Sequence, residues 1–354
     1  MAKADNVPRV TGRRLRAFAD AALRAAGLPS DDAEIVADLI VEADERGSDT
    51  HGIIRLPRYI GRIREGGVNP RPNITVTSDR PSAALVDGDN GMGHLVMRRA
   101  AQIAIEKAAT TGAAWVGARM SNHAGPASLY AAMPLAHDMI GVSLAVGSSN
   151  HMPPWGGLEM LLGTNPLAIA VPAQDEAPII LDMAPTVAAY GKVRLKQQRG
   201  EPMPVGWMED RNGNPLTDPN RADEGHLLPI GGYKGYGLSM MIGLLAGVLN
   251  RAAFGRDVVD FAADPKAVTN TGHAMLAIRI DTFAPADAFK RSVDAVVRDM
   301  RNSERMLGVE RIYVPGEQSH LRMRDRMANG VPLPASLRKS LNEMAASLGV
   351  APLE

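Results

Sequence analysis

The chain has 354 residues, 45% of them hydrophobic, which is enough to fill the cores of more than one globular domain. Its 39 Lys and Arg balance its 39 Asp and Glu, so the zero net charge gives no reason to expect a nucleic-acid or membrane-surface partner. The lack of cysteine excludes disulfides, thiolate catalysis and sulfur-ligated zinc, and it fits a cytoplasmic protein. Residues 1–20 have no signal-peptide core, and no stretch approaches the roughly 20 apolar residues of a membrane span.

Apolar residues at helical spacing predict a helical hairpin at the start of the chain. The first stripe covers residues 15–23, with Thr11 placed to cap its helix. The second stripe covers residues 35–43, and Asp31 with Glu34 resembles a capping box at its start.

The polar segment that follows predicts a site for a small acid. If the chain after His51 is helical, Arg55 lies one turn away and Tyr59 one turn further, so the three side chains share a face. A histidine transfers protons near neutral pH, an arginine binds a carboxylate through two parallel hydrogen bonds, and a tyrosine donates a hydrogen bond. The alternative is a simple helix cap at Thr50 beside a solvated His51.

Strands and helices then alternate along the middle of the chain. Strands are expected at residues 83–87, 113–117, 140–146, 167–171, 179–181 and 274–280, and helices at 95–108, 289–300 and 337–348. Pro185 is expected to begin or interrupt a helix that ends near Gly191-Lys192, and residues 199–226, rich in Gly, Pro, Asp and Asn, form a surface excursion. This order predicts an α/β sheet domain flanked by a helical one.

Polar residues follow two of the predicted strands. His123 closes the strand at 113–117, in the position where open α/β sheets bind ligands, although it is equally compatible with a structural role. Asp182 follows the strand at 179–181, where a carboxylate is costly to bury unless it is paired, for example with a histidine. No G-x-G-x-x-G fingerprint lies between a strand and a helix, so a standard Rossmann site is not supported.

Residues 227–250 combine a glycine-rich turn with a long apolar run. Glycines at 231, 232, 235 and 237 surround Lys234, and the apolar run at 238–249 is long enough for about three helical turns. Close backbone approach, helix-start N–H groups and the lysine charge together suit a phosphate or a cofactor amide. The alternative is a turn into a core helix with Lys234 in solvent.

Several short segments, in this order along the chain, resemble one family. They are Thr50-His51-Gly52 with Arg55, Leu56 and Tyr59; Ser121-Asn122-His123; Pro154-Trp155-Gly156-Gly157; Gly163-Thr164-Asn165-Pro166; Asp182-Met183-Ala184; Gly191-Lys192; Lys234-Gly235-Tyr236-Gly237; and Pro315-Gly316-Glu317. The set is similar to the malate/L-lactate dehydrogenase family of nicotinamide-dependent oxidoreductases, which includes sulfolactate, ureidoglycolate and diketogulonate enzymes and cyclic-imine reductases.

The resemblance implies a fold unrelated to the Rossmann type. It implies a three-layer α/β/α mixed-sheet domain for NAD or NADP over residues 79–317, beside a helical substrate-side domain formed by residues 1–78 and 318–354. It also implies a homodimer that acts on a small carboxylate substrate.

The resemblance also implies roles for individual residues. The expected cofactor contacts are Ser148, Pro178, Ile179, Ile180, Leu181, Asp182, Met183, Ala184, Tyr233, Lys234, Gly316, Glu317 and Gln318. His51 matches the catalytic acid, with Asp182 as the partner that orients it, and His123 matches a proton acceptor of some members. Arg55 is expected to bind the substrate carboxylate, with Thr50 and Tyr59 beside it.

The expected reaction is hydride transfer between NAD(P)H and a small 2-oxo acid, of the malate or lactate dehydrogenase kind. Ureidoglycolate dehydrogenation and cyclic imino acid reduction are alternatives within the family. A silent binding protein on the same scaffold is a further alternative. A metal-dependent hydrolase drawn from His51, His123, His151 and Asp182 lacks the close ligand spacing of a metal motif, so no metal is expected.

Overall fold

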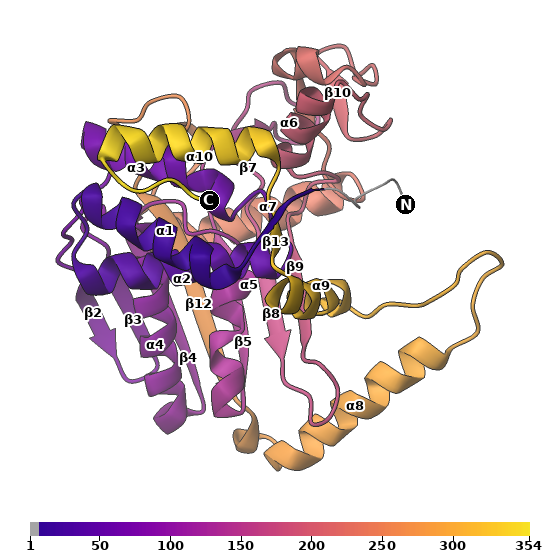
Figure 1. Ribbon diagram of the computed structural model, residues 1–354. Helices are drawn as coiled ribbons and strands as arrows, with labels where there is room; N and C mark the ends of the chain where they lie inside the picture. Colours follow the sequence, from indigo (N-terminus) through magenta and orange to yellow (C-terminus); the bar gives the residue numbers. More distant parts are fainter. Residues whose placement is uncertain (1–6) are drawn as a thin grey trace.

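The computed structural model describes residues 7–354, and its centre is a seven-stranded sheet (Figure 1). In spatial order the strands are β2 (Thr75–Arg80), β3 (Ala83–Asp87), β4 (Ala113–Ser121), β12 (Thr271–Arg279), β5 (Met139–Ala145), β8 (Leu167–Val171) and β9 (Ile179–Met183). Strands β3 and β4 run parallel, and each other neighbouring pair is antiparallel. The predicted mixed α/β sheet is therefore confirmed.

Helices cover both faces of the sheet. Helix α4 (Gly93–Thr111) packs with Met275, whereas α7 (Tyr233–Ala246) packs with the neighbouring Ala274. Because successive side chains of a strand point to opposite faces, α4 and α7 lie on opposite sides. The short α5 (Ser128–Ala131) joins α4 on its face, and η4 (Val248–Asn250) follows α7. The predicted three-layer arrangement is confirmed.

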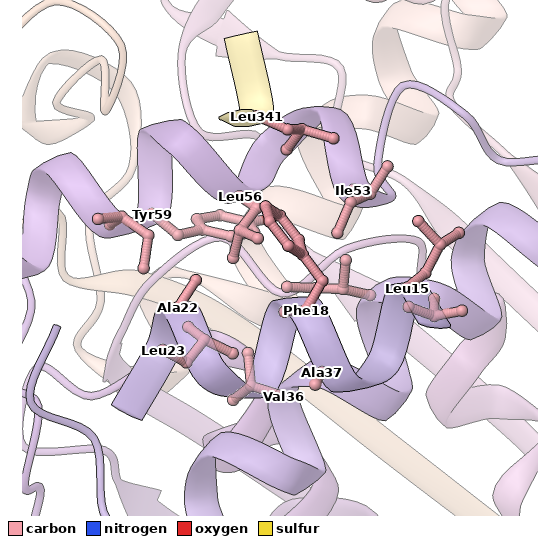
Figure 2. Close-up of a cluster of buried hydrophobic side chains, with 14 of the residues drawn as sticks. Leu15, Phe18, Ala22, Leu23, Val36, Ala37, Ile53, Leu56, Tyr59 and Leu341 are labelled. Atoms are coloured by element: carbon pink, nitrogen blue, oxygen red, sulfur yellow. The ribbon is translucent and has the colours of Figure 1, made fainter. Parts of the chain in front are cut away.

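Helices from the two ends of the chain share a separate apolar core. They are α1 (Gly12–Ala25), α2 (Ser30–Glu45), α3 (Leu56–Glu65) and α10 (Ala335–Leu348). Figure 2 shows Phe18, Leu56 and Leu341 converging between them. Strand β1 (Arg9–Val10) pairs with β13 (Val331–Pro332), which follows α9 (Glu317–Asn329), so the sequence ends are also joined by backbone hydrogen bonds.

Of the two helix caps predicted near the start of the chain, one is present and the other is wrong. Thr11 caps α1 as expected, since its side chain accepts a hydrogen bond from Arg14 N–H. Helix α2 begins at Ser30 directly after Pro29, so Asp31 lies inside the first turn and the predicted capping box is wrong. The fixed backbone of proline sets this earlier start.

The prediction of a helix between Pro185 and Gly191 is also wrong. Helix α6 (Tyr190–Arg199) begins where that helix was expected to end. Residues 185–187 instead lie extended beside 228–230, with Ile230 N–H donating to Pro185 O and Val187 N–H donating to Leu228 O. These hydrogen bonds satisfy the backbone without a helix.

The surface excursion is a small lobe that projects beside α6 (Figure 1). Strand β10 (Met208–Asp210) pairs with β11 (Gly225–Leu227), and η3 (Pro219–Glu224) lies between them in sequence. Val193 of α6 packs with Met208 and Leu227 in its own apolar cluster. The predicted turn is present, since Gly213 has φ 79° and donates to Asp210 O.

The remaining elements are short, apart from α8 (Ala286–Asn302), which lies with the following loop away from the main body (Figure 1). They are η1 (Ile53–Arg55), η2 (Met133–His137), β6 (Asn150–Met152), β7 (Leu162–Gly163), η5 (Gly255–Asp257) and η6 (Ile280–Thr282). Within residues 7–354, no helix has both the length and the apolar character needed to cross a bilayer.

Candidate active site

A cavity of about 610 Å³ lies where the helical core, the sheet and α6 meet. The helical part contributes Thr50, His51 and Arg55, and the sheet side contributes His123 and Ser148. The structure therefore brings together the main residues predicted for proton transfer and carboxylate binding.

A buried aspartate fixes the turn that carries His51. Asp44, only 3% exposed, accepts a hydrogen bond from Ile53 N–H at 2.7 Å. A Cβ on Gly52 would lie 2.0 Å from the Asp44 carboxylate, so glycine is required for this close approach. Burial raises the pKa of Asp44 well above its ordinary value. Sequence reasoning missed Asp44, although an acidic residue at the end of an apolar helical stripe was an available signal.

Thr50 holds His51 and Arg55 in place. The Thr50 hydroxyl oxygen lies 2.9 Å from His51 Nδ1, and Arg55 Nε donates to Thr50 O at 2.6 Å. Burial, followed by the Arg55 charge, lowers the pKa of His51 from 6.5 to about 4. The imidazole of His51 is therefore neutral at neutral pH.

His123 stacks on His51, with 5.5 Å between ring centroids, and its other face stacks on Phe261 at 5.3 Å. The Tyr59 hydroxyl lies 2.6 Å from His123 Nδ1. Burial is the largest cause of a pKa for His123 well below 6.5, and the neighbouring His51 adds to it. Tyr59 is buried, its hydroxyl holds His123, and it is not among the residues that line the cavity, so its predicted substrate contact stays a prediction.

Asp182 does not orient His51 in this subunit. Its carboxylate accepts a hydrogen bond from Ser128 N–H at 3.0 Å, at the start of α5. The contact at His51 Nδ1 that was predicted for Asp182 is made in this subunit by the Thr50 hydroxyl.

The other predicted cofactor segments gather at the β9 edge of the sheet. Ile180 N–H donates to Pro315 O at 3.2 Å, and a Cβ on Gly316 would lie 2.7 Å from Ile180 O. A Cβ on Gly235, in the first turn of α7, would lie 2.8 Å from Pro185 O, just beyond β9. An edge strand, a tight glycine turn and a helix start with exposed Lys234 offer backbone N–H groups and a cation, which fit a dinucleotide.

These segments lie outside the cavity that contains His51. The chain from Ala184 leads directly to Ala189, Tyr190 and Gly191, which line the cavity, so the two regions are consecutive. Glu317 is buried, and it forms ion pairs with Arg301 and Arg311. Its side chain thus stabilises the turn, and the expectation of a direct cofactor contact applies to the backbone of that turn.

Sequence reasoning also missed several residues that line the cavity. They are His273 and Phe261, together with Tyr190 and Arg194 of α6. Their positions depend on contacts between distant segments, and only the helical spacing of Tyr190 and Arg194 gave a local signal. Within residues 7–354 no three His, Asp or Glu side chains group as metal ligands.

Comparison with known proteins identifies related chains over almost the whole length. A family model described as malate/L-lactate dehydrogenase matches residues 10–342. Malate dehydrogenase of Pyrococcus horikoshii is 39% identical over 354 residues, covering 98% of this chain and 97% of its own. Its solved structure superposes with a TM-score of 0.90 at 37% identity, again covering 98% and 97% of the two chains.

Two further relatives carry a coenzyme in their names. Ureidoglycolate dehydrogenase (NAD(+)) of Escherichia coli is 34% identical over 308 residues, 87% of each chain. A (2R)-3-sulfolactate dehydrogenase (NADP(+)) of Chromohalobacter salexigens is 31% identical over 337 residues, 95% of this chain and 97% of its own. The family model, the sequence matches and the shared fold agree, and the chain therefore belongs to the malate/L-lactate dehydrogenase family.

Proposed function

We propose that the chain catalyses reversible hydride transfer between NAD or NADP and a small 2-hydroxy/2-oxo carboxylic acid. The observation that supports this best is the pair of stacked neutral imidazoles, His51 and His123, beside Arg55 in one cavity. A neutral imidazole is a base, Arg55 is a carboxylate receptor, and a 2-hydroxy acid presents a hydroxyl next to a carboxylate.

His51 moves the proton in this proposal. With its Nδ1 held by Thr50, Nε2 is the nitrogen available to the substrate hydroxyl. In the oxidative direction the neutral ring accepts the hydroxyl proton, a step that typically contributes about 10²–10⁴-fold. When bound, NAD or NADP would supply the hydride chemistry.

Arg55 sets both the substrate position and the proton affinity of His51. A carboxylate at Arg55 fixes the reacting carbon within the cavity. The same carboxylate offsets the Arg55 charge, which is one of the two causes of the low pKa of His51. Substrate binding therefore raises the pKa of His51 and prepares it to act as the acid in the reductive direction.

The dinucleotide is proposed to lie along the β9 edge. Residues 178–184, 233–234 and 316–318 would hold it through backbone N–H groups and the Lys234 charge, with Ser148 at the cavity. In this division residues 79–317 bind the cofactor, and residues 1–78 with 318–354 form the substrate side.

A homodimer is proposed from the apolar surface of α7 and η4. Leu238, Met241, Leu245, Val248 and Leu249 are all exposed, and they follow Lys234 along the chain. A contiguous exposed apolar surface of this kind is typical of a subunit interface. Light scattering is expected to give twice the mass of the 37.6 kDa chain, whereas a monomer mass would remove the proposal.

The cysteine-free composition supports a cytoplasmic location.

The test of the reaction is an absorbance screen at the reduced-nicotinamide band. Malate, lactate, sulfolactate, ureidoglycolate and cyclic imino acids are offered with each coenzyme. Turnover of at least one 2-hydroxy acid is expected. Turnover of the imino acids alone would replace the proposal with imine reduction, and coenzyme binding without any turnover would favour the silent binding protein.

A further inference from the structure

The cavity contains more positive than negative side chains. Arg55, Arg58 and Arg194 line it, and Asp260 is its one acidic lining residue. The three arginines donate to neutral acceptors, namely the carbonyls of Thr50 and Ala262 and the side-chain amide of Gln197. Among residues 7–354, none of the three has an ion-pair partner. With its histidines neutral, the cavity therefore carries excess positive charge.

Aromatic stacking positions Arg194 on the wall of this cavity. The rings of His151 and Tyr190 stack at 4.0 Å between centroids, nearly parallel at 7°. The Arg194 guanidinium lies over the Tyr190 ring, 5.3 Å from its centroid. Tyr190 and Arg194 are one turn apart on α6, and Ser149 holds the His151 ring through a 3.0 Å contact. A guanidinium supported on an aromatic ring keeps its hydrogen-bonding edge for a ligand.

The start of α6 lies at the catalytic end of the cavity. A Cβ on Gly191 would lie 3.1 Å from Thr50 Cβ, and Thr50 is the hydrogen-bond partner of His51. The cavity is thus bounded by Arg55 on the helical side and by Arg194 on the α6 side.

We propose that Arg194 is a specificity-determining residue that binds a second anionic group, at the end of the substrate opposite the 2-hydroxy carboxylate. This inference rests on the proposed function, because Arg55 is taken as the receptor of the first carboxylate. The planar guanidinium fork suits a carboxylate or a sulfonate, and the excess positive charge favours a dianion over a monoanion of the same shape.

A phosphate of the coenzyme is a second source of negative charge. The substrate is favoured because Arg194 lies in the cavity with His51, whereas the predicted dinucleotide contacts other than Ser148 lie along β9 outside it. The experiment must separate these two anions.

The test compares malate with its 4-amide, which has the same shape and one charge less. The variant Arg194→Gln is expected to lower the ratio of kcat/KM for malate to that for the amide by about 10- to 100-fold, the usual effect of one lost charged hydrogen bond. Arg199→Gln, at the exposed end of the same helix and outside the cavity, is the matched control and should keep the wild-type ratio. Equal melting temperatures of the two variants establish that both are folded.

Two results would overturn the proposal. One is an unchanged ratio in Arg194→Gln, and the other is a higher KM for the coenzyme with no change in the malate-to-amide ratio. Calorimetric binding of malate and its 4-amide to the wild type and to Arg194→Gln gives a readout that does not need turnover. A binding preference for malate that depends on Arg194, in a protein without turnover, would support this inference while the proposed reaction fails. Turnover of malate and its amide with equal efficiency by the wild type would support the reaction while this inference fails.

Discussion

His51 and His123, two of the four histidines that line the cavity, differ in what holds them. Thr50 contacts Nδ1 of His51, and the buried Tyr59 hydroxyl contacts Nδ1 of His123. Burial raises the pKa of Tyr59, so its hydroxyl stays protonated across the working pH range. Both rings are therefore fixed and neutral, but only His51 is adjacent in sequence to Thr50, whose carbonyl holds Arg55, the proposed receptor of the substrate carboxylate.

Substitution separates the roles of these histidines. His51→Gln removes the proton-transferring ring, so kcat is expected to fall by about 10²–10⁴-fold while the coenzyme dissociation constant is kept. His123→Gln is expected to lower kcat less, because His51 keeps its Thr50 contact. Steady-state kinetics with a fluorescence titration of NADH measure both quantities. Near-normal kcat in His51→Gln together with a large loss in His123→Gln would reverse the assignment.

At the residue scale, the sequence predicts that neighbouring polar residues share a site. His51 and Arg55 both line the cavity as expected, but His51 lies in a turn and α3 begins only at Leu56, so the helical face expected for His51, Arg55 and Tyr59 is absent. The Tyr59–His123 contact joins residues 64 positions apart, and no local pattern encodes such a distance. The same reason explains why Asp182 was paired with His51 on chemical grounds, although Ser128 is its partner in the subunit.

At the element scale, α6 connects the β9 edge of the sheet with the turn that carries His51. The sequence placed a helix before Gly191 because Pro185 resembles a helix start, but residues 185–187 pair with 228–230 instead. A proline is compatible with either a first helical turn or an extended segment, and the distant segment 228–230 decides between them. The outcome is that Gly191 opens α6 against Thr50.

Gly191→Ala tests this contact. The new Cβ would lie 3.1 Å from Thr50 Cβ and Cγ2, so Thr50 must shift by tenths of an ångström and move His51 with it. We expect kcat/KM to fall by about tenfold, since small displacements of reacting groups are costly. The melting temperature should change little, because alanine favours the helix while the contact opposes it.

The matched control is Gly61→Ala in α3, whose Cβ would meet no atom within 4 Å. This variant should keep full activity and gain slight stability, because alanine is the better helix former. Full activity in Gly191→Ala would mean that α6 does not press on the catalytic turn. Measurements of kcat/KM and melting temperature on the same preparations decide the matter.

At the scale of the whole molecule, local patterns predict the elements but not their order in the sheet. Strand β12 comes late in the sequence, yet it lies between β4 and β5 at the centre. Its pairing joins residues more than a hundred positions apart, for example Met275 with Val116 and Ser143. The cavity depends on this order, because it brings the ends of β4 and β5, with His123 and Ser148, beside His273. The cavity therefore could not be predicted from the sequence, because the order of the strands in the sheet could not.

Buried histidines make the fold sensitive to acid. Burial lowers the pKa of His51, His151 and His273 to about 4 each, and that of His94 to about 3. An unfolded histidine titrates near 6.5, so between about pH 6.5 and 4 the unfolded chain binds more of these protons than the folded chain. Their contribution to stability is complete above pH 6.5 and is lost as the pH falls. Asp44, whose pKa is raised, acts in the opposite sense.

His94 offers a test of this linkage for a single group. Its side chain is 0% exposed, and among the described residues neither ring nitrogen has a hydrogen-bond partner. His94→Leu removes one titrating group from the apolar start of α4, so the free energy of unfolding should fall less between pH 7 and pH 4.5 than it does in the wild type. Urea unfolding at both pH values measures this difference, and His137→Gln, at an exposed position, is measured as the surface control. If His94→Leu loses stability as steeply as the wild type, then protonation of His94 does not contribute to the acid sensitivity.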